Sequence, residues 1–154
     1  MAELGVIGLG STIRGDDGIG VALVHELDAR KLPESVELYD AGTSGMNILH
    51  HLKDFDRVII IDAIRQEGDP GDWVFFHPED VSSSMEIRST HDANLFEALK
   101  LSETLGERPE EVVIMGVIPA DLSLSEDLSP ELEERLPELV GALEEKVQEM
   151  VRPA

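Results

Sequence analysis

Residues 58–62 read Val-Ile-Ile-Ile-Asp, and this stretch decides the fold. The run Val58–Ile61 has no polar position on either face, which is typical of a strand that is covered on both sides. Strands of this kind occur in parallel sheets that carry helices on their faces. We therefore expect Val58–Ile61 to be a central strand, with the carboxylate of Asp62 placed directly after its end.

The rest of the chain alternates between short apolar runs and amphipathic stretches. The further strands expected from this pattern are Leu4–Leu9, Val36–Tyr39, Trp73–Phe76 and Val112–Val117. The expected helices are Ile19–Leu27, Met46–Leu52 and Ala93–Leu105. Pro70-Gly71 and Pro78 flank one of these strands and place it at a sheet edge. Alternating strands and helices predict an open, mostly parallel α/β sheet.

The C-terminal part of the chain has the pattern of a long helix. Ser129 is a suitable N-cap and Pro130 a suitable first helical residue. Apolar residues then recur every three or four positions, and Pro137 interrupts them, so we expect a kink or two abutting helices there. The sequence contains no internal repeat, linker or low-complexity tract. It is therefore interpreted as one domain over residues 1–154.

Composition excludes several classes of protein. The 154 residues include 33 acidic and 12 basic side chains and no cysteine, so disulfides, thiol nucleophiles and cysteine metal ligands are ruled out. The formal net charge of −21 disfavours nucleic acid and anionic membranes as partners. The N-terminus lacks the features of a signal peptide, which predicts a cytoplasmic protein. The acidic excess fits a solvated surface, with a salt-rich cytoplasm as the alternative.

The loop after the first expected strand is rich in glycine and acid. It begins Gly8-Leu9-Gly10 and continues Gly15-Asp16-Asp17-Gly18. A dinucleotide fingerprint would need glycine at Ile13, and a phosphate loop would need Lys followed by Ser or Thr where the two acids stand. Nucleotide binding is therefore disfavoured. Capping of the next helix would use only one of the two carboxylates, so the other acid requires a different explanation.

Polar residues gather where the strands are expected to end. In an open α/β sheet, ligands bind beyond the carboxyl ends of the strands. Asp17, Asp62 and His91 each follow an expected strand or precede an expected helix, so the fold brings them to one edge. Two carboxylates and one imidazole suit a divalent first-row metal with open coordination positions. Such a metal polarises a carbonyl or activates water.

The sequence resembles the maturation endopeptidases of nickel–iron hydrogenases. The resemblance rests on blocks that occur in the family's order, namely Gly8-Leu9-Gly10 with Gly15-Asp16-Asp17-Gly18-Ile19-Gly20, Asp40-Ala41-Gly42-Thr43, Val58-Ile59-Ile60-Ile61-Asp62-Ala63, Ser89-Thr90-His91, Gly116-Val117-Ile118-Pro119 and Leu128-Ser129-Pro130. It implies a three-layer sandwich, with a mostly parallel, twisted sheet of about five strands and helices on both faces. Ser11 and Asp127 depart from the family's pattern, in regions expected to touch the substrate.

The resemblance also implies a function. These enzymes remove a C-terminal extension from the hydrogenase large-subunit precursor after nickel insertion. Asp17, Asp62 and His91 match the residues that contact metal in the family, with the nickel supplied by the precursor and other divalent metals able to substitute. Either Asp16 or Asp40 is then a candidate to accept a proton from water, and metal binding could alternatively serve recognition alone. The resemblance suggests a monomer that meets a large protein partner.

Three alternatives stay open at the level of sequence. A nickel-sensing docking partner or chaperone would use the same ligands without cleavage. A phospho-receiver domain also has an acidic pair and a strand-end Asp, but it needs a Lys where Val117-Ile118-Pro119 stands. A serine hydrolase would use Ser44 with His91, although Gly42-Thr43-Ser44-Gly45 is one residue shorter than the usual nucleophile turn.

Overall fold

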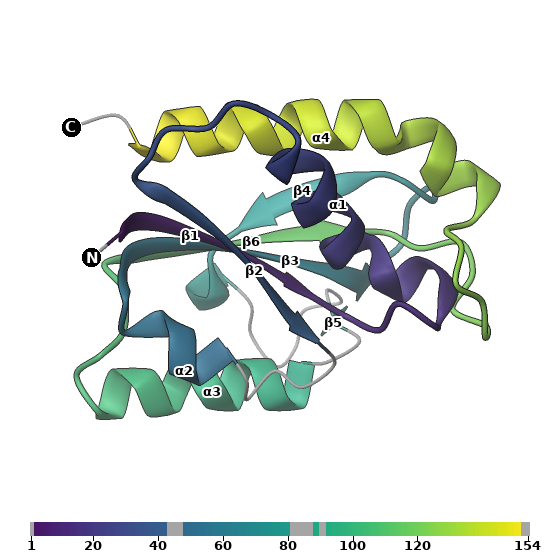
Figure 1. The fold of residues 1–154 in the computed structure, drawn as a ribbon. Coiled ribbons are helices and arrows are strands. Elements are labelled where there is room, and N and C mark those ends of the chain that lie inside the picture. Colours follow the sequence, from purple (N-terminus) through teal and green to yellow (C-terminus); the bar gives the residue numbers. More distant parts are fainter. Residues whose placement is uncertain (1, 43–47, 81–87, 90–91, 152–154) are drawn as a thin grey trace.

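The strands of a computed structural model form one sheet between two layers of helices (Figure 1). The structure describes residues 2–42, 48–80, 88–89 and 92–151. Its elements are β1 (Ala2–Leu9), η1 (Gly15–Gly18), α1 (Ile19–Asp28), β2 (Val36–Gly42), α2 (Leu49–Leu52), β3 (Phe55–Arg65), β4 (Trp73–Phe76), η3 (Pro78–Asp80), β5 (Arg88–Ser89), α3 (Asp92–Thr104), β6 (Glu111–Val117) and α4 (Pro130–Val151).

The sheet order is β2-β1-β3-β6-β4, with β5 paired separately to β3. Four adjacent strands of this order are parallel, namely β2, β1, β3 and β6. Strand β4 runs antiparallel to β6 at the sheet edge. The prediction of a mostly parallel sheet of about five strands with helices on both faces is therefore confirmed. The edge position expected for Trp73–Phe76 is also confirmed.

Side chains alternate between two apolar cores, one on each face of the sheet. On β3, Ile59, Ile61 and Ala63 pack with residues of α1 and α4. The other core contains Val58 and Ile60, together with residues of α2 and α3. Figure 1 shows α1 and α4 on one side of the sheet and α2 and α3 on the other. Because both faces are covered, the unbroken apolar sequence of the central strand follows directly from its position.

The long C-terminal helix begins as expected. Ser129 accepts a hydrogen bond from the Leu132 backbone N–H at 3.3 Å, and Pro130 is the first residue of α4. The helix continues through Pro137 to Val151 as one element, so the alternative of two abutting helices is wrong. Five of its apolar residues pack into the α1/α4 core beyond this proline, which holds the helix together despite the missing N–H. In the described part of the chain, no helix is long and apolar enough to cross a membrane.

Candidate active site

Strand β3 extends further than its neighbour β1, and Asp62 lies where they part. The last β1–β3 pair joins Gly8 and Ile61, whereas β3 continues to Arg65. Asp62 pairs with Gly116 of β6, so it lies inside the strand, and the expectation that it follows the strand end is wrong. The physical reason is that β6 and β5 still offer backbone partners after β1 has left the sheet. Asp62 is fully buried and, by alternation, shares the face of Val58 and Ile60.

Glycine allows helix α1 to approach this part of the sheet closely. A Cβ atom on Gly20 would lie 2.5 Å from the carbonyl oxygen of Ile61 and 2.8 Å from that of Leu9. A Cβ atom on Gly8 would lie 2.5 Å from the Gly20 carbonyl oxygen. The first turn of α1 therefore rests on the backbone immediately before Asp62. The glycines serve contact between helix and sheet, which agrees with the exclusion of a phosphate loop.

Asp17 is buried at the start of this helix. Its Oδ2 accepts a hydrogen bond from the Ser11 backbone N–H at 2.9 Å, just beyond the end of β1. The N-cap of α1 is Gly18 and makes no side-chain capping bond, so the helix-capping interpretation of the acidic pair is wrong. Asp17 lies three residues before Gly20 in the chain, and Asp62 directly follows Ile61, the β3 residue whose carbonyl Gly20 approaches.

The carboxylate of Asp16 does not share the environment of Asp17, because it binds backbone N–H groups of a loop far along the chain. Nothing in the sequence near Asp16 predicted these hydrogen-bond partners. Its Oδ2 accepts hydrogen bonds from the backbone N–H groups of Ala120 and Asp121, at 2.8 and 3.0 Å. Its Oδ1 accepts one from the Ser129 N–H at 2.7 Å. The side chain is fully buried. A charged carboxylate that receives three N–H groups is well compensated, and here it ties the first loop to residues 120–129.

Of the remaining sequence candidates, Asp40 lies within the described residues. Asp40 is exposed near the end of β2, opposite Gly8, and its Oδ1 accepts the Gly42 N–H at 2.9 Å. His91, Thr43 and Ser44 lie outside the described residues. Ser89, two residues before His91 in the sequence, pairs with Ile64, two residues after Asp62. Among the residues that the structure describes, no group of three His, Asp or Glu side chains is placed to hold a metal ion.

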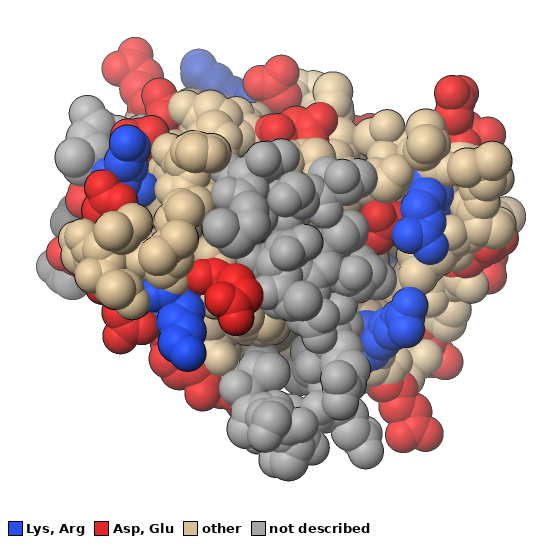
Figure 2. All heavy atoms as spheres, turned by 90° about the horizontal axis from the view of Figure 1, so that it is seen from below, with Lys and Arg blue, Asp and Glu red and all other residues tan. Residues whose placement is uncertain are grey.

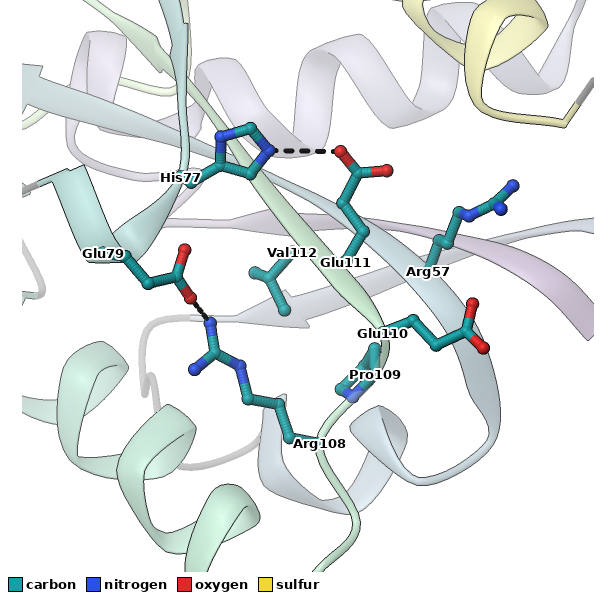
Figure 3. A pocket seen from close by; sticks show the side chains of 8 residues that line it. All are labelled: Arg57, His77, Glu79, Arg108, Pro109, Glu110, Glu111 and Val112. Carbon is teal, nitrogen blue, oxygen red and sulfur yellow. Dashed lines mark hydrogen bonds and ion pairs between the residues drawn. The ribbon is translucent and has the colours of Figure 1, made fainter. Parts of the chain in front are cut away.

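Among the described residues, cavities lie at both ends of the parallel strands. The larger, of about 660 Å³, adjoins the beginnings of β3 and β6 and is lined mainly by charged residues (Figure 3). Its basic side chains face carboxylates: His77 Nε2 lies 3.1 Å from Glu111, and Arg108 pairs with Glu79. This cavity is at the amino-terminal ends of the parallel strands, away from Asp17 and Asp62. We therefore do not assign the reaction to it.

The second cavity lies beside the first loop, and sequence reasoning missed it. It has a volume of about 370 Å³. Its lining residues are Gly15, Ala120, Asp121, Ser125, Asp127, Leu128, Ser129, Pro130 and Glu131. Hydrogen bonds from the side chain and backbone of Ser123 lower the pKa of Asp121, which keeps that exposed carboxylate charged. The sequence signal that could have indicated this cavity is Leu124, a single large apolar residue among acidic and small polar ones. The structure shows its side chain exposed.

Comparison with known proteins gives consistent results. A family model described as hydrogenase maturation protease matches residues 21–146. The hydrogenase 2 maturation protease of Escherichia coli K12 is 34% identical over 131 residues, which make up 83% of this chain and 80% of that protein. A solved hydrogenase maturating endopeptidase from E. coli superposes with a TM-score of 0.85 at 29% identity, covering 97% of this chain and 94% of that one.

An archaeal structure extends the comparison. The hydrogenase 2 maturation peptidase of a Thaumarchaeota archaeon is 31% identical and superposes with a TM-score of 0.72, covering 94% of this chain and 97% of that one. The likeness therefore spans the elements that place Asp16, Asp17 and Asp62.

Proposed function

This chain belongs to the hydrogenase maturation protease family, and on that premise we propose that it removes the C-terminal extension of a nickel–iron hydrogenase large-subunit precursor once nickel has been inserted. Membership supports an endopeptidase role in hydrogenase maturation. The observation that carries the finer proposal is the burial of Asp17, just before α1, and of Asp62, directly after the β3 residue that α1 contacts. Family membership leaves no role for the phospho-receiver alternative.

The donor set fits nickel that arrives with the precursor. Carboxylate oxygen and imidazole nitrogen are suitable ligands for a divalent first-row metal, and other divalent metals fit the same set. Burying two carboxylates is costly unless hydrogen bonds or cations compensate them, and a bound divalent cation adds to the partners that both groups already have. The pairing of Ser89 with Ile64 brings the chain before position 91 alongside β3. These features support Asp17, Asp62 and His91 as the nickel-recognising residues.

We assign proton transfer to Asp40 rather than Asp16. In the proposed reaction, water attacks the scissile carbonyl and its proton passes to a carboxylate. The protonated carboxyl then gives this proton to the amide nitrogen as the C–N bond breaks, so the extension leaves as an amine and the carboxylate is regenerated. All three hydrogen bonds at Asp16 come from backbone N–H groups, which leaves its carboxylate poorly placed to accept a proton. Asp40 is exposed at the carboxyl end of β2.

Asp40→Asn is expected to slow cleavage by about 100-fold without weakening precursor binding. Unchanged cleavage would exclude Asp40 from proton transfer.

The test of the proposed function is cleavage of nickel-loaded precursor, followed by intact-mass spectrometry. The wild-type protein should remove a discrete C-terminal fragment and should leave nickel-free precursor intact. Asp17→Asn, Asp62→Asn and His91→Ala should each lower the rate by more than about 100-fold, because each removes a metal-recognising group. Asp28→Asn is the matched control, since Asp28 is an exposed carboxylate at the far end of α1.

The outcomes separate the competing interpretations. Precursor binding without any change in mass would favour a docking partner or chaperone over a protease. Full activity of Asp17→Asn or Asp62→Asn would remove that residue from the mechanism. Equal cleavage of nickel-free precursor would contradict recognition through nickel.

A further inference from the structure

Two loops that are distant in sequence are joined beside the proposed site. The Gly15 N–H donates to the Ser125 carbonyl at 2.9 Å, and the Ser125 N–H donates to the Ile13 carbonyl at 3.0 Å. These bonds form a parallel bridge between Arg14 and Ser125. The Asp16 N–H also donates to the Asp121 carbonyl at 2.9 Å. Residues 13–15 and 120–129 therefore form a single surface, here called the two-loop platform.

The buried side chain of Asp16 stabilises this platform through hydrogen bonds. Its buried carboxylate accepts N–H groups from both ends of the second loop, Ala120 and Asp121 at one end and Ser129 at the other. Residues 120–129 contain no helix or regular strand before α4, so these bonds take the place of secondary structure there. Asp16 is also the chain neighbour of Asp17. The same residue pair thus connects the platform to the proposed nickel-recognising site.

The platform presents apolar side chains to solvent. Ile13 is 53% exposed and Leu124 is 82% exposed, and each immediately precedes one residue of the Arg14–Ser125 bridge. The bridge thus sets their backbones side by side. The adjoining cavity of about 370 Å³ is bordered by Asp121, Asp127 and Glu131. An apolar polypeptide segment with neutral or basic neighbours complements this surface, whereas an acidic segment is repelled.

We propose that Asp16 is a positioning residue that holds the two-loop platform in place, and that the platform, through Ile13 and Leu124, docks a segment of the precursor beside the proposed site. This inference rests on the proposed function. It adds a role for Asp16 that does not involve the chemical step. It also adds two specificity-determining residues on loops separated by more than a hundred positions.

The first experiment measures how Asp16→Asn affects each step. Asparagine has nearly the same shape but replaces one acceptor oxygen with an N–H₂ group that faces backbone donors. Amide hydrogen exchange in residues 120–129 should accelerate, and the Kd and KM for nickel-loaded precursor should rise about tenfold with little change in kcat. A lower kcat at unchanged KM and Kd would overturn the positioning role.

The second experiment uses exposed residues and does not depend on a change in the buried site. Ile13→Ser with Leu124→Ser should raise the Kd for nickel-loaded precursor about tenfold, because apolar contacts are lost. Leu101→Ser with Leu105→Ser is the matched control, because these side chains are 39% and 55% exposed at the end of α3. The control pair should leave the Kd unchanged. Equal effects from both pairs, or no effect from the first, would overturn the docking surface.

The two proposals fail in different ways. If the precursor binds through the platform but is not cleaved, the protease function fails and the docking surface stands. If the precursor is cleaved and the Ile13/Leu124 variant binds it normally, the protease function stands and the docking surface fails.

Discussion

Gly10 controls the direction in which the chain leaves β1. Its φ of +142° lies in a region that side chains disfavour, and a Cβ atom there would lie 1.9 Å from the Asp17 carbonyl oxygen. Gly10→Ala should therefore displace Asp17, lower the free energy of unfolding by about 3 kcal/mol or more, and impair cleavage. Denaturant unfolding measures the first effect, and the precursor assay measures the second.

A second glycine provides the control for this prediction. Gly141 lies on the exposed side of α4, and a Cβ atom there would meet nothing within 4 Å. Gly141→Ala should raise the free energy of unfolding by about 0.5–1 kcal/mol and leave cleavage unchanged. If Gly10→Ala were as harmless as Gly141→Ala, the proposed packing of the first loop would be wrong.

Single residues also show which parts of the site were predictable. Asp17 and Asp62 stand out in the sequence because a carboxylate beside an apolar strand or at a helix start is conspicuous, and their metal-recognising role stays a prediction. The structural role of Asp16 was not predictable, because its three donors are backbone groups that carry no side-chain signature. These donors also lie up to 113 positions from Asp16 in the sequence, so no local sequence pattern could have indicated the contact.

At the scale of elements, α4 contains an internal proline that costs it a backbone hydrogen bond. Pro137 is exposed within the helix, and it cannot donate the hydrogen bond that the Glu133 carbonyl would otherwise receive. Pro137→Ala should raise the free energy of unfolding by about 1–3 kcal/mol, as measured by denaturant unfolding. A loss of stability would mean that the proline rigidity contributes more to α4 than the missing hydrogen bond costs.

Element boundaries were harder to predict than element types. The pattern Val58–Ile61 identified the central strand, but β3 extends from Phe55 to Arg65 because neighbouring backbones continue to pair with it. Propensity describes the strand itself, whereas strand length depends on partners that are remote in sequence. The N-terminus of α4 was predictable because its N-cap and first-turn proline are local signals.

At the scale of the whole molecule, acidic charge dominates. The 33 acidic side chains outnumber the 12 basic ones by 21, so the formal net charge is −21. Figure 2 shows acidic side chains spread around the periphery of one face, with basic ones between them. Added salt screens their mutual repulsion, so the Tm should rise as NaCl increases from about 0.05 to about 1 M. Differential scanning calorimetry checks this, and a Tm independent of salt would contradict the expected repulsion.

The hydrogen bond from Ser129 to Asp16 has a consequence for the order in which the protein is made. Ribosomal synthesis delivers Asp16 early and its last donor 113 positions later. Until that donor emerges, the carboxylate must remain hydrated, because enclosing it without partners is costly. Contacts between such distant positions also form late in folding. A growing chain in which Ser129 has not yet been added therefore lacks the proposed docking platform.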